Sequence, residues 1–203
     1  DFLRQYPVVY LFFFVFCFTG IGKTTVCKKL VDLLTEAKHC VDGFYTEEVR
    51  SPDKNRIGFD IVSLRSNSQG RGALARTAEH LAGRQVSKAR VGNYHVFVSE
   101  FETLALPVFN SRSEILIIDE IGKMELFSSK FRDKVENLFF AQPREERLCV
   151  IATIPQREKV PQRYAAFFDR LRSDEACKVI EVDRQSRDNL PEAIVRMIKA
   201  APS

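Results

Sequence analysis

A glycine-rich segment that runs into a lysine and two threonines is the part of this sequence with the clearest chemical use. Glycines let the backbone curl so that successive N–H groups point inward, and a following helix adds the positive end of its dipole. Such a loop cradles phosphates. We expect the lysine to reach the β- and γ-phosphates of a nucleotide and the first threonine to ligate Mg²⁺. The candidate phosphate-binding residues are Gly20, Ile21, Gly22, Lys23, Thr24 and Thr25.

Two adjacent carboxylates form the second candidate element. Asp119 and Glu120 directly follow the apolar run Ile115–Ile118. We expect Asp119 to hold Mg²⁺ through water, and Glu120 to polarise the water that attacks the γ-phosphate. The alternative is that both acids only cap a strand or pair with a neighbour. On the first interpretation the catalytic residues are Glu120 and Lys23, and the metal ligands are Thr24 and Asp119.

Other polar residues are weaker candidates for contacts to the reacting phosphate. Thr153 follows the apolar run Leu148–Ala152, and its hydroxyl could contact the γ-phosphate or the attacking water, or only belong to a turn before Pro155. Three arginines could neutralise charge in the transition state, with Arg172 favoured. They are Arg50, Arg170 and Arg172.

The elements that must position these residues alternate between strand-like and helix-like spacing, which predicts an α/β fold. We expect a mostly parallel central sheet with helices on both faces, as in P-loop NTPases, and a β-hairpin. Expected strands are Val8–Phe16, Val41–Val49, Arg56–Leu64, Asn93–Val98, Glu114–Ile118, Leu148–Ala152 and Cys177–Val182. Expected helices are Lys23–Ala37, Phe101–Phe109, Phe127–Phe140, Pro161–Arg172 and Asn189–Lys199. Within Phe101–Phe109 we expect the helical conformation to end at Pro107. The segment Ser66–Lys88 reads as a long loop with one short helix.

Composition narrows the class of protein. The chain has 203 residues, of which 45% are hydrophobic, so we expect residues 1–203 to form one domain. Its five cysteines form no C-x-x-C pair, which indicates a reduced, intracellular, cytoplasmic protein rather than a disulfide or zinc scaffold. A net charge of +4 with mixed signs does not favour nucleic acid as a partner.

The apolar stretch Val8–Phe18 has two competing interpretations. It is too short for a membrane span, which needs roughly 20 residues. A secretory signal would need a positive flank, and Asp1 and Arg4 do not supply one. Parallel strands that are covered on both faces read as continuous apolar runs. We therefore expect a buried strand and no membrane association.

Several stretches together resemble the cancer-related nucleoside-triphosphatase family, which also has archaeal and thermophilic bacterial members. Supporting segments are FETLALP at 101–107 and ATIP at 152–155. The main matches are GIGKTT at 20–25, VDGFYTEEVR at 41–50, RIGFD at 56–60 and IIDEIGKMELF at 117–127. They occur in the family's order and cover most of the chain from about residue 20.

This resemblance implies a compact, monomeric α/β hydrolase. It implies Mg²⁺-dependent hydrolysis of ATP, GTP, CTP and UTP to the diphosphate and phosphate, with little discrimination between bases. It also places the phosphate loop on Gly20, Gly22, Lys23, Thr24 and Thr25, and the acidic element on Asp119 and Glu120.

Two alternatives remain open from the sequence. P-loops also serve kinases of nucleotides or small molecules, and the arginines of Ser66–Lys88 could form a lid over an acceptor. A non-catalytic nucleotide-binding module is the other alternative. It arises because Cys17 occupies the first position of the loop, where the family has glycine.

Overall fold

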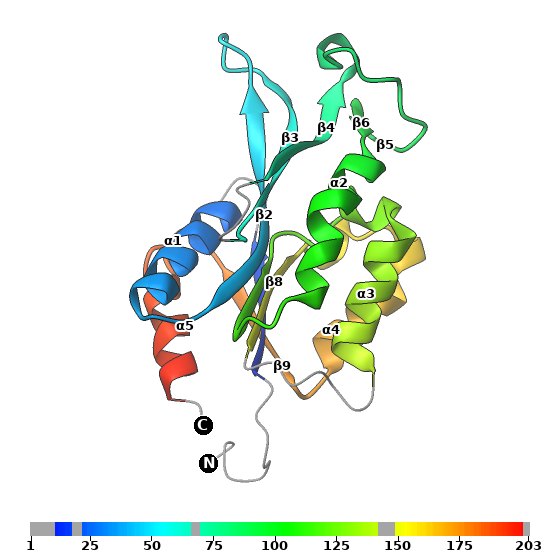
Figure 1. The fold of residues 1–203 in the computed structure, drawn as a ribbon. Helices are drawn as coiled ribbons and strands as arrows, with labels where there is room; N and C mark the ends of the chain where they lie inside the picture. The colour runs from blue at the N-terminus through cyan, green and yellow to red at the C-terminus, as the bar shows by residue number, and fades with distance from the viewer. Residues whose placement is uncertain (1–10, 18–21, 66–69, 142–148, 201–203) are drawn as a thin grey trace.

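The computed structural model describes residues 11–17, 22–65, 70–141 and 149–200. Its central feature is one nine-stranded sheet in the order β5-β6-β4-β3-β2-β7-β8-β1-β9 (Figure 1). The strands are β1 Leu11–Cys17, β2 Val41–Arg50, β3 Arg56–Ser63, β4 Arg71–Thr77, β5 Arg90–Val91, β6 Tyr94–Val96, β7 Ile115–Ile118, β8 Cys149–Ile154 and β9 Cys177–Val182.

The half of the sheet that holds the candidate residues is entirely parallel. Strands β2, β7, β8, β1 and β9 pair in parallel, so their carboxyl ends lie at one edge. Beyond β2 the pairing becomes antiparallel, through β3, β4, β6 and β5. The α/β fold and the β2–β3 hairpin are as expected, but the sheet is mixed, and the hairpin extends it rather than standing apart.

The segment 66–88 is where the sequence prediction was wrong. It contains strand β4, Arg71–Thr77, where a long loop was expected, and the short helix expected there corresponds to a 3-10 turn at Ala78–His80. The strand sequence is rich in Gly, Ala and Arg, which gives little intrinsic strand signal. Pairing with β3 and β6 and the close packing of Leu104 over Gly72 impose the extended conformation instead.

The helices cover both faces of the sheet (Figure 1). Helices α1 and α5 lie on one face, and α2, α3 and α4 lie on the other. The helices are α1 Lys23–Glu36, α2 Val98–Ala105, α3 Ser129–Phe140, α4 Ala165–Ser173 and α5 Leu190–Lys199. Among the described helices, none has both the length and the apolar character that a membrane crossing requires.

The packing of strand β7 in the core fixes the position of the sheet edge where the candidate residues lie. Ile115 and Ile117 point into the cluster under α1 and α5, whereas Leu116 and Ile118 point into the cluster under α2, α3 and α4. All four are fully buried. A strand that is covered on both faces has an unbroken apolar sequence. Strand β7 ends at Ile118, directly before the first carboxylate, Asp119.

The core also fixes the position of helix α1 on the sheet. Val26, Leu30 and Leu34 are buried against the β7 and β8 face. The helix begins directly after Gly22, whose φ is +97°. That left-handed conformation strains any residue with a side chain, so the glycine at this position has a backbone reason. The helix therefore starts with Lys23 and Thr24 in its first turn.

Candidate functional site

The first threonine of the loop and the first carboxylate after β7 meet at the carboxyl edge of the parallel strands. Thr24 Oγ1 donates to Asp119 Oδ2 at 2.7 Å and lies 3.0 Å from the carbonyl oxygen of Thr46 on β2. A hydroxyl, a carboxylate and a carbonyl are hard oxygen ligands, the type that Mg²⁺ prefers. Both predicted metal ligands therefore lie together, and their donor set fits the ion.

Asp119 is almost completely enclosed, with 1% of its surface exposed. Burial raises the pKa of its carboxyl, and the hydrogen bonds from Thr153 and Thr24 and the charge of Lys23 oppose that rise. A cation near Asp119 would favour the charged form of the carboxylate.

Lys23 and Glu120 form an ion pair across the site. Both side chains are largely buried, with 18% and 26% of their surface exposed. The two predicted catalytic residues thus come from the helix start and from the end of β7, 97 positions apart in the chain. A triphosphate bound on the loop would compete with Glu120 for the Lys23 ammonium.

Thr153 lies on β8, the strand between β1 and β7. Its hydroxyl donates to Asp119 Oδ1 at 2.5 Å, and its side chain is fully buried. From the sequence, this hydroxyl could contact the γ-phosphate or the water, or only belong to a turn. The described contact fixes the orientation of Asp119, a role that the strand-end position alone did not indicate.

The remaining loop residues differ in what the structure says of them. Gly20 and Ile21 lie outside the described residues, and so does the side chain of Cys17. Thr25 is exposed beside Gly22, where its hydroxyl lies 3.3 Å from the position that a Cβ on Gly22 would take.

The three candidate arginines have other described partners. Arg50 pairs with Glu48 on the β2–β3 hairpin, and Arg170 stacks on Phe140, 3.7 Å from the ring centroid. Arg172 donates to the carbonyl oxygen of Pro155 at 3.0 Å. Since Pro155 follows the end of β8, Arg172 is the candidate that approaches the edge of the sheet where the site lies.

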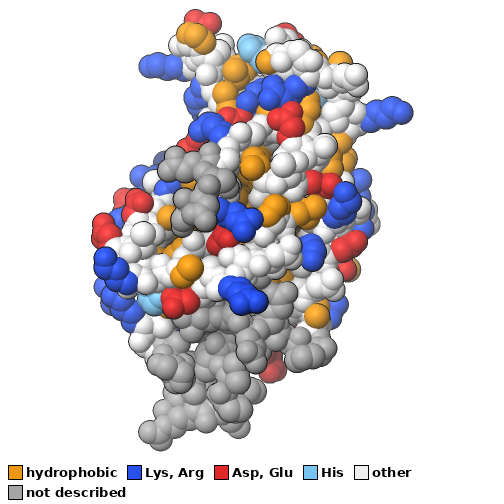
Figure 2. All heavy atoms as spheres, viewed as in Figure 1, with side chains coloured by type: hydrophobic (Ala, Val, Ile, Leu, Met, Phe, Trp, Pro, Cys, Tyr) orange, Lys and Arg blue, Asp and Glu red, His pale blue; other side chains and the backbone are white. Residues whose placement is uncertain are grey.

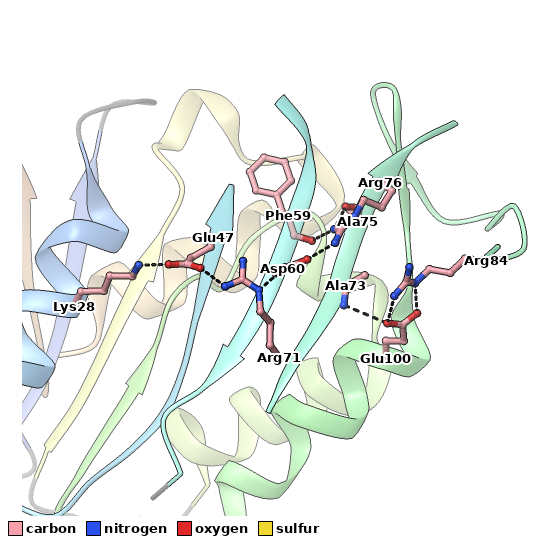
Figure 3. Close-up of polar contacts among 10 residues, drawn as sticks. All are labelled: Lys28, Glu47, Phe59, Asp60, Arg71, Ala73, Ala75, Arg76, Arg84 and Glu100. Atoms are coloured by element: carbon pink, nitrogen blue, oxygen red, sulfur yellow. Dashed lines mark hydrogen bonds and ion pairs between the residues drawn. The ribbon is translucent and has the colours of Figure 1, made fainter. Parts of the chain in front are cut away.

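Sequence reasoning missed a charged ladder that joins the loop helix to the antiparallel strands (Figure 3). Lys28 on α1 pairs with Glu47 on β2. Arg71 on β4 bonds both Glu47, at 2.7 Å, and Asp60 on β3, at 2.6 Å. Arg76 completes the ladder by pairing with Asp60. No local signal pointed to the ladder, because Lys28 lies on a helix and Arg71 and Arg76 lie on β4, a strand that the sequence did not predict.

The ladder has electrostatic consequences at its centre. The hydrogen bond from Lys28 lowers the pKa of Glu47, with Arg71 adding to the effect. The hydrogen bond that Arg71 donates to Asp60 raises the pKa of the Arg71 guanidinium. Since Glu47 follows Thr46, which lies 3.0 Å from the Thr24 hydroxyl, the ladder ties the antiparallel strands to the site. On the face seen in Figure 2, basic and acidic side chains are interspersed, in line with the mixed charge of the sequence.

Comparison with known proteins decides the family. The family model described as NTPase matches residues 13–195, nearly the whole chain. The chain belongs to the NTPase family. This confirms the resemblance to which the sequence motifs pointed.

Individual members of the NTPase family align over most of their length. The chain is 37% identical over 190 residues to the cancer-related nucleoside-triphosphatase homolog of Mus musculus, covering 90% of this chain and 93% of the relative. It is 38% identical over 183 residues to the nucleoside-triphosphatase THEP1 of Thermotoga petrophila, covering 89% and 88%. The crystal structure of THEP1 from Aquifex aeolicus superimposes with a TM-score of 0.73 at 32% identity, over 93% of this chain and 99% of that one.

Proposed function

We propose that this member of the NTPase family hydrolyses nucleoside 5′-triphosphates to the diphosphate and phosphate with Mg²⁺ as cofactor. One observation carries the proposal: the Thr24 hydroxyl lies 2.7 Å from the Asp119 carboxylate, beside the Lys23–Glu120 ion pair. The relatives named above carry the name nucleoside-triphosphatase, which supports the enzyme class.

Each residue of the site has a role in this proposal. Residues Gly20 to Thr25 hold the phosphates, Lys23 binds the β- and γ-phosphates, and Thr24 and Asp119 hold Mg²⁺. The bound ion would neutralise charge that develops on the phosphate oxygens. Glu120 orients a water in line with the γ-phosphate and accepts its proton, while Thr153 keeps Asp119 in place.

Broad base specificity is part of the proposal. The residues brought together at the site address phosphates, metal and water, which ATP, GTP, CTP and UTP share. We also propose that residues 1–203 act as one domain and as a monomer. A cytoplasmic location remains a prediction from the cysteine pattern.

The structure weakens the alternative that this protein is a kinase. The segment 66–88 was its expected acceptor lid, but Arg71 and Arg76 lie on strand β4 and are engaged in ion pairs with Glu47 and Asp60. Water is therefore the favoured acceptor.

Phosphate release from ATP and GTP, with and without Mg²⁺, tests the proposal. The wild type should release phosphate only with Mg²⁺, and Lys23→Ala should abolish release. Lys29→Ala is the matched control, because Lys29 lies on the same helix but pairs with Glu192. Tight nucleotide binding without release by the wild type would favour the non-catalytic module, and a rate that rises with an added hydroxyl acceptor would favour a kinase.

A further inference from the structure

A buried glutamate, Glu125, lies next to the catalytic candidate Glu120 and has no role in the proposed mechanism so far. Glu125 begins a short 3-10 turn after β7 and is 5% exposed. Its Oε2 accepts the backbone N–H of Gly122 at 3.1 Å. A carboxyl group in such a place is costly unless it is paired or neutral, so its presence calls for an explanation.

The loop that carries Glu125 is tied firmly to the core. The Ile121 N–H donates to the carbonyl oxygen of Thr153 at 2.8 Å, and the Leu126 N–H donates to that of Gly122 at 3.0 Å. The side chains of Ile121 and Leu126 are buried in the main core cluster. Glu125 is therefore held on a well-supported turn, and its carboxyl has little freedom to turn away.

Gly122 shows that the carboxyls of Glu120 and Glu125 converge. A Cβ on Gly122 would lie 2.6 Å from Glu120 Oε1 and 2.8 Å from Glu125 Oε2. Both oxygens therefore occupy the space that a side chain would fill, and the two carboxyl groups face each other across it. A side chain at this position would displace the carboxyl oxygens of Glu120 and Glu125.

Two ionised carboxylates at such a place would repel one another. Burial, and next the charge of Glu120, raise the pKa of Glu125 to about 8. The charge of Lys23 opposes that rise, and the charge of Asp119 adds to it. Near neutral pH Glu125 therefore keeps its proton, and its carboxyl is neutral where it meets Glu120.

We propose that Glu125 is a positioning residue for Glu120. It fixes the Glu120–Gly122 turn by accepting the Gly122 N–H, and its neutral carboxyl adds no second charge beside the Lys23–Glu120 ion pair. This inference rests on the proposed function, in which Glu120 orients the attacking water. Ionisation of Glu125 would place a second charge beside Glu120 and disturb both its orientation and its pairing with Lys23.

Two substitutions of Glu125 separate its role as a hydrogen-bond acceptor from the effect of its proton. Glu125→Gln stays neutral at every pH and keeps an oxygen that can accept the Gly122 N–H, so kcat near pH 7 should stay within about twofold of the wild type. Glu125→Ala loses the acceptor, so its kcat should fall by about tenfold or more at all pH values, with KM for ATP little changed.

The pH profile of kcat is the readout that a merely structural role would not move. The wild-type rate should decline above about pH 8, where Glu125 ionises, and Glu125→Gln should lack that decline. Thermal melting of each variant shows that it is folded. An unchanged alkaline decline in Glu125→Gln, or a loss in folded Glu125→Gln as deep as in Glu125→Ala, would overturn the inference.

Two further variants complete the test. Gly122→Ala tests the geometry without a change of charge, and Glu120→Gln tests the proposed function separately. Gly122→Ala should lower kcat, because the added Cβ displaces both carboxyls, and wild-type turnover in that variant would overturn the inference. Glu120→Gln is measured in parallel. Normal turnover in Glu120→Gln would overturn both proposals, whereas an inactive Glu120→Gln with an unaltered Glu125→Gln pH profile would overturn this inference alone.

Discussion

The Thr24 hydroxyl lies 2.7 Å from Oδ2 of Asp119, although the two residues are 95 positions apart in the chain. Helix α1 brings the hydroxyl and strand β7 brings the carboxylate to the same edge of the sheet. This contact joins the phosphate loop to the acidic element, and the proposed metal site depends on it.

Substitutions at this contact should weaken the use of Mg²⁺ before they weaken the fold. We expect Thr24→Ala and Asp119→Asn each to raise the Mg²⁺ concentration for half-maximal phosphate release by roughly 10–100-fold. Titration of Mg²⁺ at saturating ATP measures the effect. Thr103→Ala, at an exposed position of α2, is the matched control. A wild-type Mg²⁺ requirement in both site variants would remove these residues from the metal site.

Thr153→Val tests whether the buried hydroxyl holds Asp119 in place. Valine has the same shape but cannot donate to Asp119 Oδ1, so that oxygen is left without its donor. We expect a cost in unfolding free energy of about 1–3 kcal/mol, and a higher Mg²⁺ requirement. Denaturant unfolding and the same Mg²⁺ titration measure both effects, and Thr153→Ser, which keeps the hydroxyl, should show neither. Equal behaviour of the valine and serine variants would contradict the role.

Asp60 should matter for stability rather than for chemistry. It is 7% exposed and lies between Arg71 and Arg76, so Asp60→Asn leaves the largely buried Arg76 without its charged partner. Removing one member of a buried pair typically costs about 3–5 kcal/mol. Thermal melting should show a clear drop in the midpoint. The exposed Asp133→Asn, which loses a surface pair with Arg132, should change it little. A midpoint for Asp60→Asn as high as the control's would contradict the account of the ladder.

The buried carboxyl of Glu125 should also make the stability of the folded protein depend on pH. The folded state keeps the Glu125 proton up to about pH 8, whereas an unfolded glutamate releases it near pH 4.5. The folded state thus binds one more proton between these values, and stability falls as pH rises through this window. The melting temperature of the wild type should fall relative to that of Glu125→Gln between pH 5 and 8. A constant difference across that range would mean that Glu125 is ionised in the folded protein.

Local motifs account for the part of the site that could be predicted from the sequence. Gly22 to Thr24 lie within one turn, and Asp119 directly follows the apolar strand β7, so short-range pattern was enough to nominate them. The contact of Thr153 with Asp119 depends on packing between separate strands, and the convergence of Glu125 on Glu120 depends on how the turn after β7 folds against the core. No spacing rule along the chain encodes such contacts.

The same distinction explains the error in the fold. Strands β2 and β3 were predicted because they flank a turn-rich segment and are rich in apolar residues. Strand β4 was missed because Arg71–Thr77 contains few residues that favour strands, and its extended form comes from pairing with β3 and β6.

Glu120→Gln is the measurement that most directly tests the central claim, that Glu120 orients the water which attacks a triphosphate held by Lys23 and Thr24. Nucleotide affinity and single-turnover phosphate release are measured on the same preparation, with the exposed Glu48→Gln as control. We expect nucleotide binding to be retained and release to slow by about 10²- to 10⁴-fold, while the control behaves as the wild type. Release at the wild-type rate from Glu120→Gln would contradict the account.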